Sequence, residues 1–322
     1  MENRFDQLVE ECLTDLFIRH PALATDSGVH EWDGLLDDFS GEAVSDEISA
    51  IRSFKSRFAE LPVKGLDRGR RVDHAILVSK LEGRLLELEQ IRTHERNPRV
   101  YGDLISTGLL PLALFEFAPA EQRLRSVIER ENQIPKLLDT ARENLAGIPE
   151  VLLKTSLDSI RGTLNFVRDD LPSAFKQLKD EPLISEFGRS TSTAVSAIEE
   201  FIEELERRGS DPRNSFALGR SLYEARLKCE EGIDISSSEL LAVAERELAA
   251  AQRAFRETTG RIDSARDPME VWREVESDHA APGELANEAR EQLASLVAFI
   301  KDRHIVTLPD VEPPVVSSSP DF

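Results

Sequence analysis

Two of the histidines in this sequence stand directly before a glutamate, and this pair of residue types is part of a zinc motif. In a helix that carries His-Glu-x-x-His, imidazoles at positions i and i+4 bind the metal and the glutamate is the general base. "HEWDG", which begins at His30, has Gly34 at the fifth position, and "HERNP", which begins at His94, has Pro98 there. Neither segment therefore forms that zinc helix.

The remaining histidines are too far apart to complete such a site within one helix. No two are closer than ten positions, and they stand at positions 20, 30, 74, 94, 279 and 304. "DHAAPGEL" echoes a His-Glu-x-x-Pro-Gly-His motif, but it lacks the glutamate after His279 and has Glu284 in place of the second histidine. We expect no metal ligands in this chain, although distant histidines and carboxylates brought together by the fold stay an alternative.

Adjacent acidic residues offer a second kind of chemistry, because carboxylate pairs serve in hydrolysis and in metal binding. The pairs are Asp37-Asp38, Asp169-Asp170, Glu199-Glu200 and Glu203-Glu204. On a helix, Glu199 and Glu203 are like-charged neighbours one turn apart, which water tolerates on an exposed face. Solvated helix faces are therefore the favoured interpretation, and a stand-alone hydrolase built on these pairs ranks last.

No segment of the sequence predicts nucleophilic or phosphate chemistry. There is no Gly-x-Ser-x-Gly elbow and no Gly-x-x-x-x-Gly-Lys-Ser/Thr loop. Cys12 stands near Leu8, Leu13 and Leu16 in a helical pattern, which predicts a buried and inert thiol.

The composition excludes several classes of partner. The 322 residues carry a formal charge of −21, which repels nucleic acid and anionic membranes. Two distant cysteines and the acidic start "MENRFDQLVEECL" favour the cytoplasm. The most apolar stretch, "LISTGLLPLALFEFA", is too short to cross a bilayer and contains Pro111 and Glu116, so we expect no membrane span.

Apolar residues recur at helical spacing through nearly the whole chain, which predicts an all-α fold, an elongated bundle of long helices. Helices are expected at about 3–19, 42–60, 69–95, 120–146, 149–178, 214–229 and 283–303, and also around "AIEEFIEELERRGSDP" and "SSSELLAVAERELAAAQRAFRETTG". We expect a helical domain over 1–304, with two subbundles divided near 180–190. The proline- and serine-rich segment 305–322 reads as an extended connector.

Two segments are candidates for substrate binding. "HEWDGLLDDFS" is a loop punctuated by Gly34, and its polar groups make His30 and Asp33 candidates for a pocket wall. Asn97 begins a turn before the next helix, on which Tyr101 either packs with a partner for its hydroxyl or faces a substrate channel.

These same segments carry a resemblance to a known family. "GVHEWDGLLDD", "NPRVYGDLISTGLL", "FAPAEQRLRSVIERENQIPKLLDTARENL" and "LVAFIKDRHIVTLPD" resemble, in order and spacing, family eight-eight-five of the bacterial domains of unknown function. Members look like helical zinc metallopeptidases. In them the ligands and general base lie on a His-Glu-x-x-Pro-Gly-His helix downstream of the segment similar to "IVTLPD", so this chain has no zinc-binding or catalytic residues to which those roles transfer.

The resemblance implies that the chain is the N-terminal helical half of such a protein and forms one wall of a peptide-binding cleft. Its partner would be a C-terminal zinc-binding half, and zinc would be the cofactor of the complete protein. We expect the chain to be inactive by itself, whether it is a fragment, a truncated product or one piece of a split enzyme. The alternative is a non-enzymatic helical scaffold or interaction protein with a disordered tail.

Overall fold

The protein is all-α, as the periodicity predicted. The computed structural model describes residues 2–281, 283–309 and 314–316, and those residues form helices and no strand. Contacts divide the described residues into two compact units, unit 1 up to Ile235 and unit 2 from Ser236 onward. The domain limits expected near 180–190 and at 304 stay predictions.

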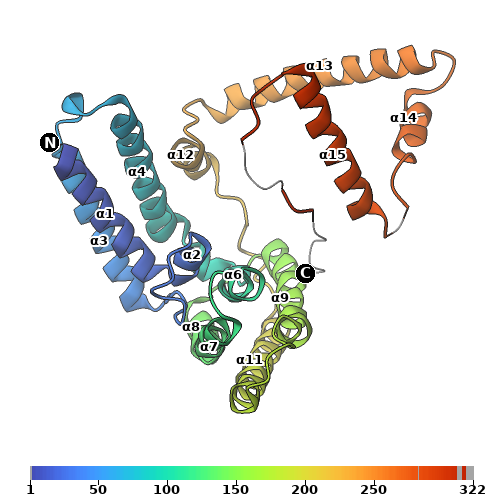
Figure 1. The fold of residues 1–322 in the computed structure, drawn as a ribbon. Helices are drawn as coiled ribbons and strands as arrows, with labels where there is room; N and C mark the ends of the chain where they lie inside the picture. Colours follow the sequence, from blue (N-terminus) through green and yellow to red (C-terminus); the bar gives the residue numbers. More distant parts are fainter. Residues whose placement is uncertain (1, 282, 310–313, 317–322) are drawn as a thin grey trace. The chain divides into compact units, whose positions relative to one another are not determined.

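Unit 1 contains most of the helices (Figure 1). Its elements in chain order are α1 (Glu2–Arg19), α2 (Pro21–Asp26), α3 (Gly41–Ala59), the 3₁₀ turn η1 (Val63–Gly65), α4 (Arg68–Leu86), the π turn η2 (Glu87–Ile91), α5 (Thr93–Arg96), α6 (Arg99–Leu114), α7 (Ala120–Glu131), α8 (Ile134–Asn144), α9 (Glu150–Asn165), the π turn η3 (Phe166–Asp170), α10 (Leu171–Ser173), α11 (Glu181–Arg208) and α12 (Arg220–Glu231).

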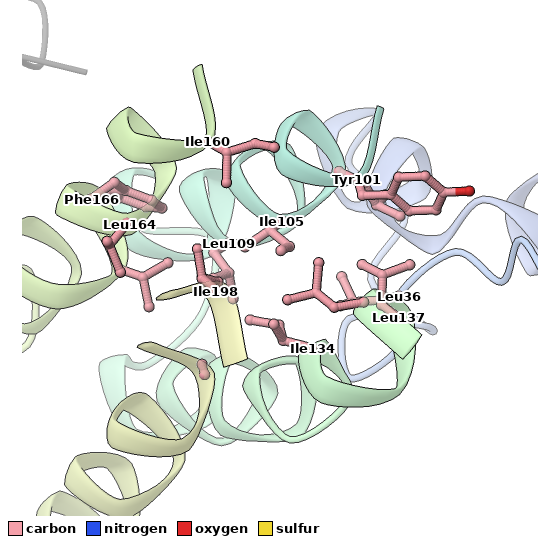
Figure 2. Packing of buried hydrophobic residues seen from close by; sticks show 14 of the residues in the cluster. Leu36, Tyr101, Ile105, Leu109, Ile134, Leu137, Ile160, Leu164, Phe166 and Ile198 are labelled. Atoms are coloured by element: carbon pink, nitrogen blue, oxygen red, sulfur yellow. The ribbon is translucent and has the colours of Figure 1, made fainter. Parts of the chain in front are cut away.

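The main core of unit 1 surrounds α6, which packs against α2, α7, α8 and α9. The helical spacing of the sequence puts four residues on one face of this helix, and all four are buried: Tyr101, Leu104, Ile105 and Gly108. Figure 2 shows Ile105 among apolar side chains from neighbouring helices. The helical period therefore predicted the central element of the core correctly.

Glycines let other elements come close to α6. A Cβ atom on Gly102 would lie 2.8 Å from Cγ1 of Ile160 on α9, and one on Gly108 would lie 2.7 Å from Cδ2 of Leu36. Contacts this short do not occur for real Cβ atoms, so a larger residue at either position forces the neighbouring side chain to move.

A second, smaller core lies between α1, α3 and α4. Phe5, Leu8, Cys12, Phe58 and Leu66 are among its buried residues. Cys12 is 6% exposed, and burial raises the pKa of its thiol to about 11. The predicted buried thiol is confirmed, and a raised pKa keeps it protonated and unreactive at neutral pH.

The described residues of unit 2 form three helices, α13 (Ser237–Ile262), α14 (Pro268–Glu276) and α15 (Leu285–Arg303). The sequence places Ser236 three positions before Glu239, the spacing of a capping box. That box is present, because Ser236 accepts from the Glu239 amide and the Glu239 carboxylate accepts from the Ser236 amide. Residues 305–309 and 314–316 are not helical, and the extended connector stays a prediction. The rest of the predicted connector lies outside the described residues.

Several predicted boundaries were wrong because the chain changes its winding. The helix predicted over 69–95 is α-helical only as far as Leu86. It continues as the π turn η2 and ends at Arg92, whose φ is 55°. The helix predicted over 149–178 passes through η3 before Pro172, which has no amide donor. α13 passes through Gly260 and ends at Ile262.

Prolines and N-cap residues explain where other helices begin or end. The helix predicted over 120–146 is two helices separated before Pro135, as the missing amide donor indicated. Ser40, a residue type that favours the N-cap position, caps α3 and accepts a hydrogen bond from the Ala43 amide at 3.3 Å. Pro119 is the N-cap residue of α7. The sequence did not predict α2 or α14, which are short.

None of the described helices is both long enough and apolar enough to cross a membrane.

Packing around α6 makes a stability prediction. Leu109 is fully buried on α6, whereas Leu114 on the same helix is 52% exposed. Leu109→Ala should lower the free energy of unfolding by about 2–5 kcal/mol, because it removes buried methyl groups and leaves a cavity. Leu114→Ala should change it by less than about 0.5 kcal/mol. Urea unfolding followed by circular dichroism measures both, and equal effects would contradict this core.

Candidate functional site

The loop that follows α2 contains His30 and Asp33, which the structure brings together. Gly28 has a φ of +80°, which turns the chain out of α2. Nδ1 of His30 lies 3.1 Å from a carboxylate oxygen of Asp33, and the imidazole stacks on the ring of Phe117 at 3.7 Å. His30 is exposed, while Asp33 is buried. Solvent therefore reaches the imidazole of His30, whereas the carboxylate of Asp33 is part of the interior.

A chain of hydrogen bonds continues inward from Asp33. The hydroxyl of Thr25 lies 2.6 Å from the Asp33 carboxylate, and Nη2 of Arg130 lies 2.6 Å from the same hydroxyl. Arg130 also donates to the carbonyls of Pro21 and Gly108. These contacts fasten the loop to α7 and α6 through one side chain.

Arg130 is an unusual residue to find at the centre of a helical core. It is fully buried, and its Nε has no hydrogen-bond partner among the described residues. Burial lowers the pKa of its guanidinium to about 10, against the opposing charges of Asp33 and Asp37. The group therefore stays charged at neutral pH and depends on the carbonyls and carboxylates around it.

The side chain of Gln133 forms hydrogen bonds with the backbone of the next part of the loop. Its Oε1 accepts from the Leu36 amide at 3.1 Å, and its Nε2 donates to the Gly34 carbonyl at 2.7 Å. A Cβ atom on Gly34 would lie 1.8 Å from an oxygen of Glu129, so only glycine fits without displacing that side chain. The glycine that ruled out a zinc helix thus lies against α7.

The structure places Tyr101 in the core. Its hydroxyl donates to the His94 carbonyl at 2.7 Å and accepts from Nδ2 of Asn144 at 3.0 Å, and burial raises the pKa of the phenol to about 12. Its side chain is fully buried. The geometry corresponds to the packing interpretation of this residue, and a contact with substrate stays a prediction.

Asn97 lies at the turn between α5 and α6. Its Oδ1 accepts from the Ser156 hydroxyl at 3.0 Å and from the Arg99 amide at 3.2 Å. The side-chain amide of Asn97 therefore joins the start of α6 to α9. Asn97 and Tyr101 therefore have anchoring contacts of their own, separate from the contact that joins His30 and Asp33.

Sequence reasoning missed a polar cluster centred on His20, which precedes α2. Its Nδ1 lies 2.7 Å from Asp37, and its Nε2 lies 3.1 Å from Glu47 on α3. Arg84 on α4 donates two hydrogen bonds to Glu47, at 2.6 and 2.9 Å. We call these four residues the His20 cluster. One signal was present in the sequence, because Glu47 occupies the apolar face of its helix, four positions before Ile51.

Charge in the His20 cluster is strongly stabilised. Burial disfavours the charged imidazole of His20, but hydrogen bonds with Asp37 and Glu47 outweigh it and raise the pKa to about 9. Burial also raises the pKa of Glu47, but hydrogen bonds from His20 and Arg84 outweigh it and lower that pKa to about 2. At neutral pH the cluster is thus a network of ions in which each charge has a partner.

The described residues do not fit a catalytic zinc ion. They contain no group of three or more histidine, cysteine or acidic side chains arranged to hold a metal. In the His20 cluster both imidazole nitrogens already have carboxylate partners, and Glu47 is occupied by a guanidinium. The first acidic pair is also in use, since Asp37 accepts from the Ala22 amide as well as contacting His20.

Comparisons with known proteins place this architecture. The family described as "Bacterial protein of unknown function (DUF885)" matches residues 21–322. A solved structure described as that of "a putative lipoprotein of unknown function" from Shewanella oneidensis shares the fold, with a TM-score of 0.76 at 22% identity. The match covers 98% of this chain but 61% of that protein, so the chain spans less than two thirds of its length. Comparison with curated proteins gave no match.

The His20 cluster predicts how stability depends on pH. The folded pKa of His20, about 9, lies above its ordinary value of 6.5, so its contribution is complete below pH 6.5 and disappears as the pH rises through 9. His20 should account for a loss of about 3 kcal/mol of unfolding free energy in the wild type across this interval. His20→Gln should lack most of that loss.

Urea unfolding at pH 6 and pH 9 measures the effect. His279→Gln, at an exposed position, is the matched control and should keep the pH dependence of the wild type. An identical slope in His20→Gln and the wild type would show that the cluster does not hold the charged imidazole.

Proposed function

The chain belongs to the DUF885 family of bacterial proteins, and we propose that it is the helical, cleft-forming portion of a zinc-dependent peptidase-like protein. A further portion would supply the zinc site and the catalytic groups. The peptidase activity rests on the resemblance of the "GVHEWDGLLDD" and "NPRVYGDLISTGLL" segments. The described residues of this chain would form part of the cleft wall and contact the peptide. They would not hold the zinc ion, because their side chains do not fit a metal site.

The observation that carries the proposal is the apolar surface of unit 2. Of its described residues, only Thr259 and Val271 are buried. Phe255 and Trp272 contact each other edge to face at 6.2 Å between ring centroids, and α15 buries no residue at all. The unit's own helices therefore leave much of their apolar surface to be covered by something else.

The uncovered side chains follow the helical period. On α15 they include Leu296 and Phe299, which are 56% and 52% exposed, and on α13 they include Leu241 and Leu248. Stripes of this spacing usually pack against another element. A further portion of a larger protein is the occupant that we propose, and the 61% coverage of the solved relative supports it.

The docking surface of the proposal can be tested by binding. The partner for the test is a DUF885 segment that carries His-Glu-x-x-Pro-Gly-His, produced as a separate chain. It should bind the present chain, and Leu296→Asp should weaken binding at least about tenfold by placing a charge in an apolar contact. Ser295→Asp, at the adjacent exposed position, is the matched control and should bind like the wild type.

The chemistry of the proposal needs a separate measurement. The chain alone should neither retain zinc by metal analysis nor cleave a peptide library, whereas the complex should cleave peptides until a chelator is added. A complex that binds without cleaving would favour the non-enzymatic scaffold. Chelator-sensitive cleavage by the isolated chain would overturn the assignment of the zinc site to another portion.

A further inference from the structure

The helices α1, α3 and α4 lie side by side (Figure 1). A cavity of about 110 Å³ lies between them, beside their packed core. Its walls are mainly apolar and include Leu16, Ile51, Phe54, Leu77 and Leu81. All of these except Ile51 are only partly buried, although each belongs to a helix face directed at its neighbours. The helices therefore enclose apolar space that their own side chains do not fill.

The cavity also has charged residues in its walls. They are the cations Arg19, His20, Lys80 and Arg84 and the carboxylates of Asp15 and Glu47. Both carboxylates are already engaged, because Asp15 accepts from Arg19 at 2.8 Å and Glu47 accepts from Arg84 at 2.6 Å. The wall therefore has an excess of positive charge in a protein whose net charge is −21.

Lys80 is the cation available to a ligand. The described residues give its ammonium no ion pair or hydrogen bond, unlike Arg19 and Arg84. The side chain is exposed, so it can reach a polar group at the mouth of the cavity. An amine on a flexible four-carbon stem suits a point contact with an anion.

We propose that this cavity binds a small amphiphilic carboxylate, with its apolar group between α1, α3 and α4 and its carboxylate at Lys80. Apolar cavities of about 150 Å³ bind benzene, so one of about 110 Å³ suits a short alkyl chain or a branched side chain. A free short-chain acid and the C-terminal residue of a peptide share this chemistry. The site is independent of the zinc-dependent function proposed above.

Isothermal titration with hexanoate and with uncharged hexanol tests the site in the full chain. Hexanoate should bind the wild type, and Leu77→Phe should weaken it at least about tenfold by filling the cavity. Ile76→Phe, at a neighbouring exposed position on α4, is the matched control and should bind normally. Lys80→Gln should weaken hexanoate about fivefold and leave hexanol unchanged, since only the acid contacts the ammonium.

Acetyl-Ala-Leu and its C-terminal amide distinguish the two sources of the carboxylate. Binding of the free dipeptide acid, lost in Leu77→Phe, identifies a peptide C-terminus as a ligand, whereas binding of hexanoate alone identifies a free acid. The Lys80→Gln variant keeps the test valid if Leu77→Phe fails to fold, because its side chain is exposed. Binding of neither acid, or unchanged affinities in the folded variants, would overturn the proposal.

Discussion

The buried guanidinium of Arg130 is the interaction on which the loop and its surroundings depend. A charge without water is tolerated only where fixed polar groups replace its hydration. Here the carbonyls of Pro21 and Gly108 and the hydroxyl of Thr25 do so. They come from α2 and α6, so satisfying one charge on α7 determines where two other helices lie. The loop that contains Asp33 then follows from its bond to Thr25.

Two other arginines donate to carbonyls at helix ends. Arg123 is buried and donates to the Leu112 carbonyl, in the last turn of α6, at 2.6 Å. Arg208 donates to the carbonyl of Leu145, which caps α8. The last carbonyls of a helix lack partners within it and carry partial negative charge, so a guanidinium suits them. A strongly acidic protein thus uses several of its cations to close helix ends.

Local signals in the sequence predicted much of the fold. The caps at Ser40 and Ser236 and the buried face of α6 depend on residues within a few positions of one another, and all three are confirmed. α2 was missed because its six residues have no apolar period long enough to recognise, and tertiary contacts hold them. The π turns η2 and η3 were missed because their windings leave no pattern in a single sequence.

The candidate site was harder to predict because its contacts join distant positions. Of the four candidate substrate-binding residues, His30 and Asp33 are three positions apart and contact each other. The "HEWDG" loop is held by a hydrogen bond from Gln133 to the Gly34 carbonyl. Nothing local indicates that His20 contacts Glu47, 27 positions away, or that Arg130 contacts Thr25, 105 positions away. Arg130 stands among polar residues in "RENQIP", a pattern typical of a surface residue, but the fold buries it.

Replacement of Arg130 by an uncharged residue tests the central role of this side chain most directly. In Arg130→Met, native-state hydrogen exchange should show amides of the loop over 27–40 and of α2 opening at least about tenfold more often. Unfolding free energy should fall by roughly 3–5 kcal/mol, as the carbonyls lose their donors. Arg125→Met, at an exposed position on α7, should change neither. Protection of the loop and α2 equal to that of the wild type would contradict the account.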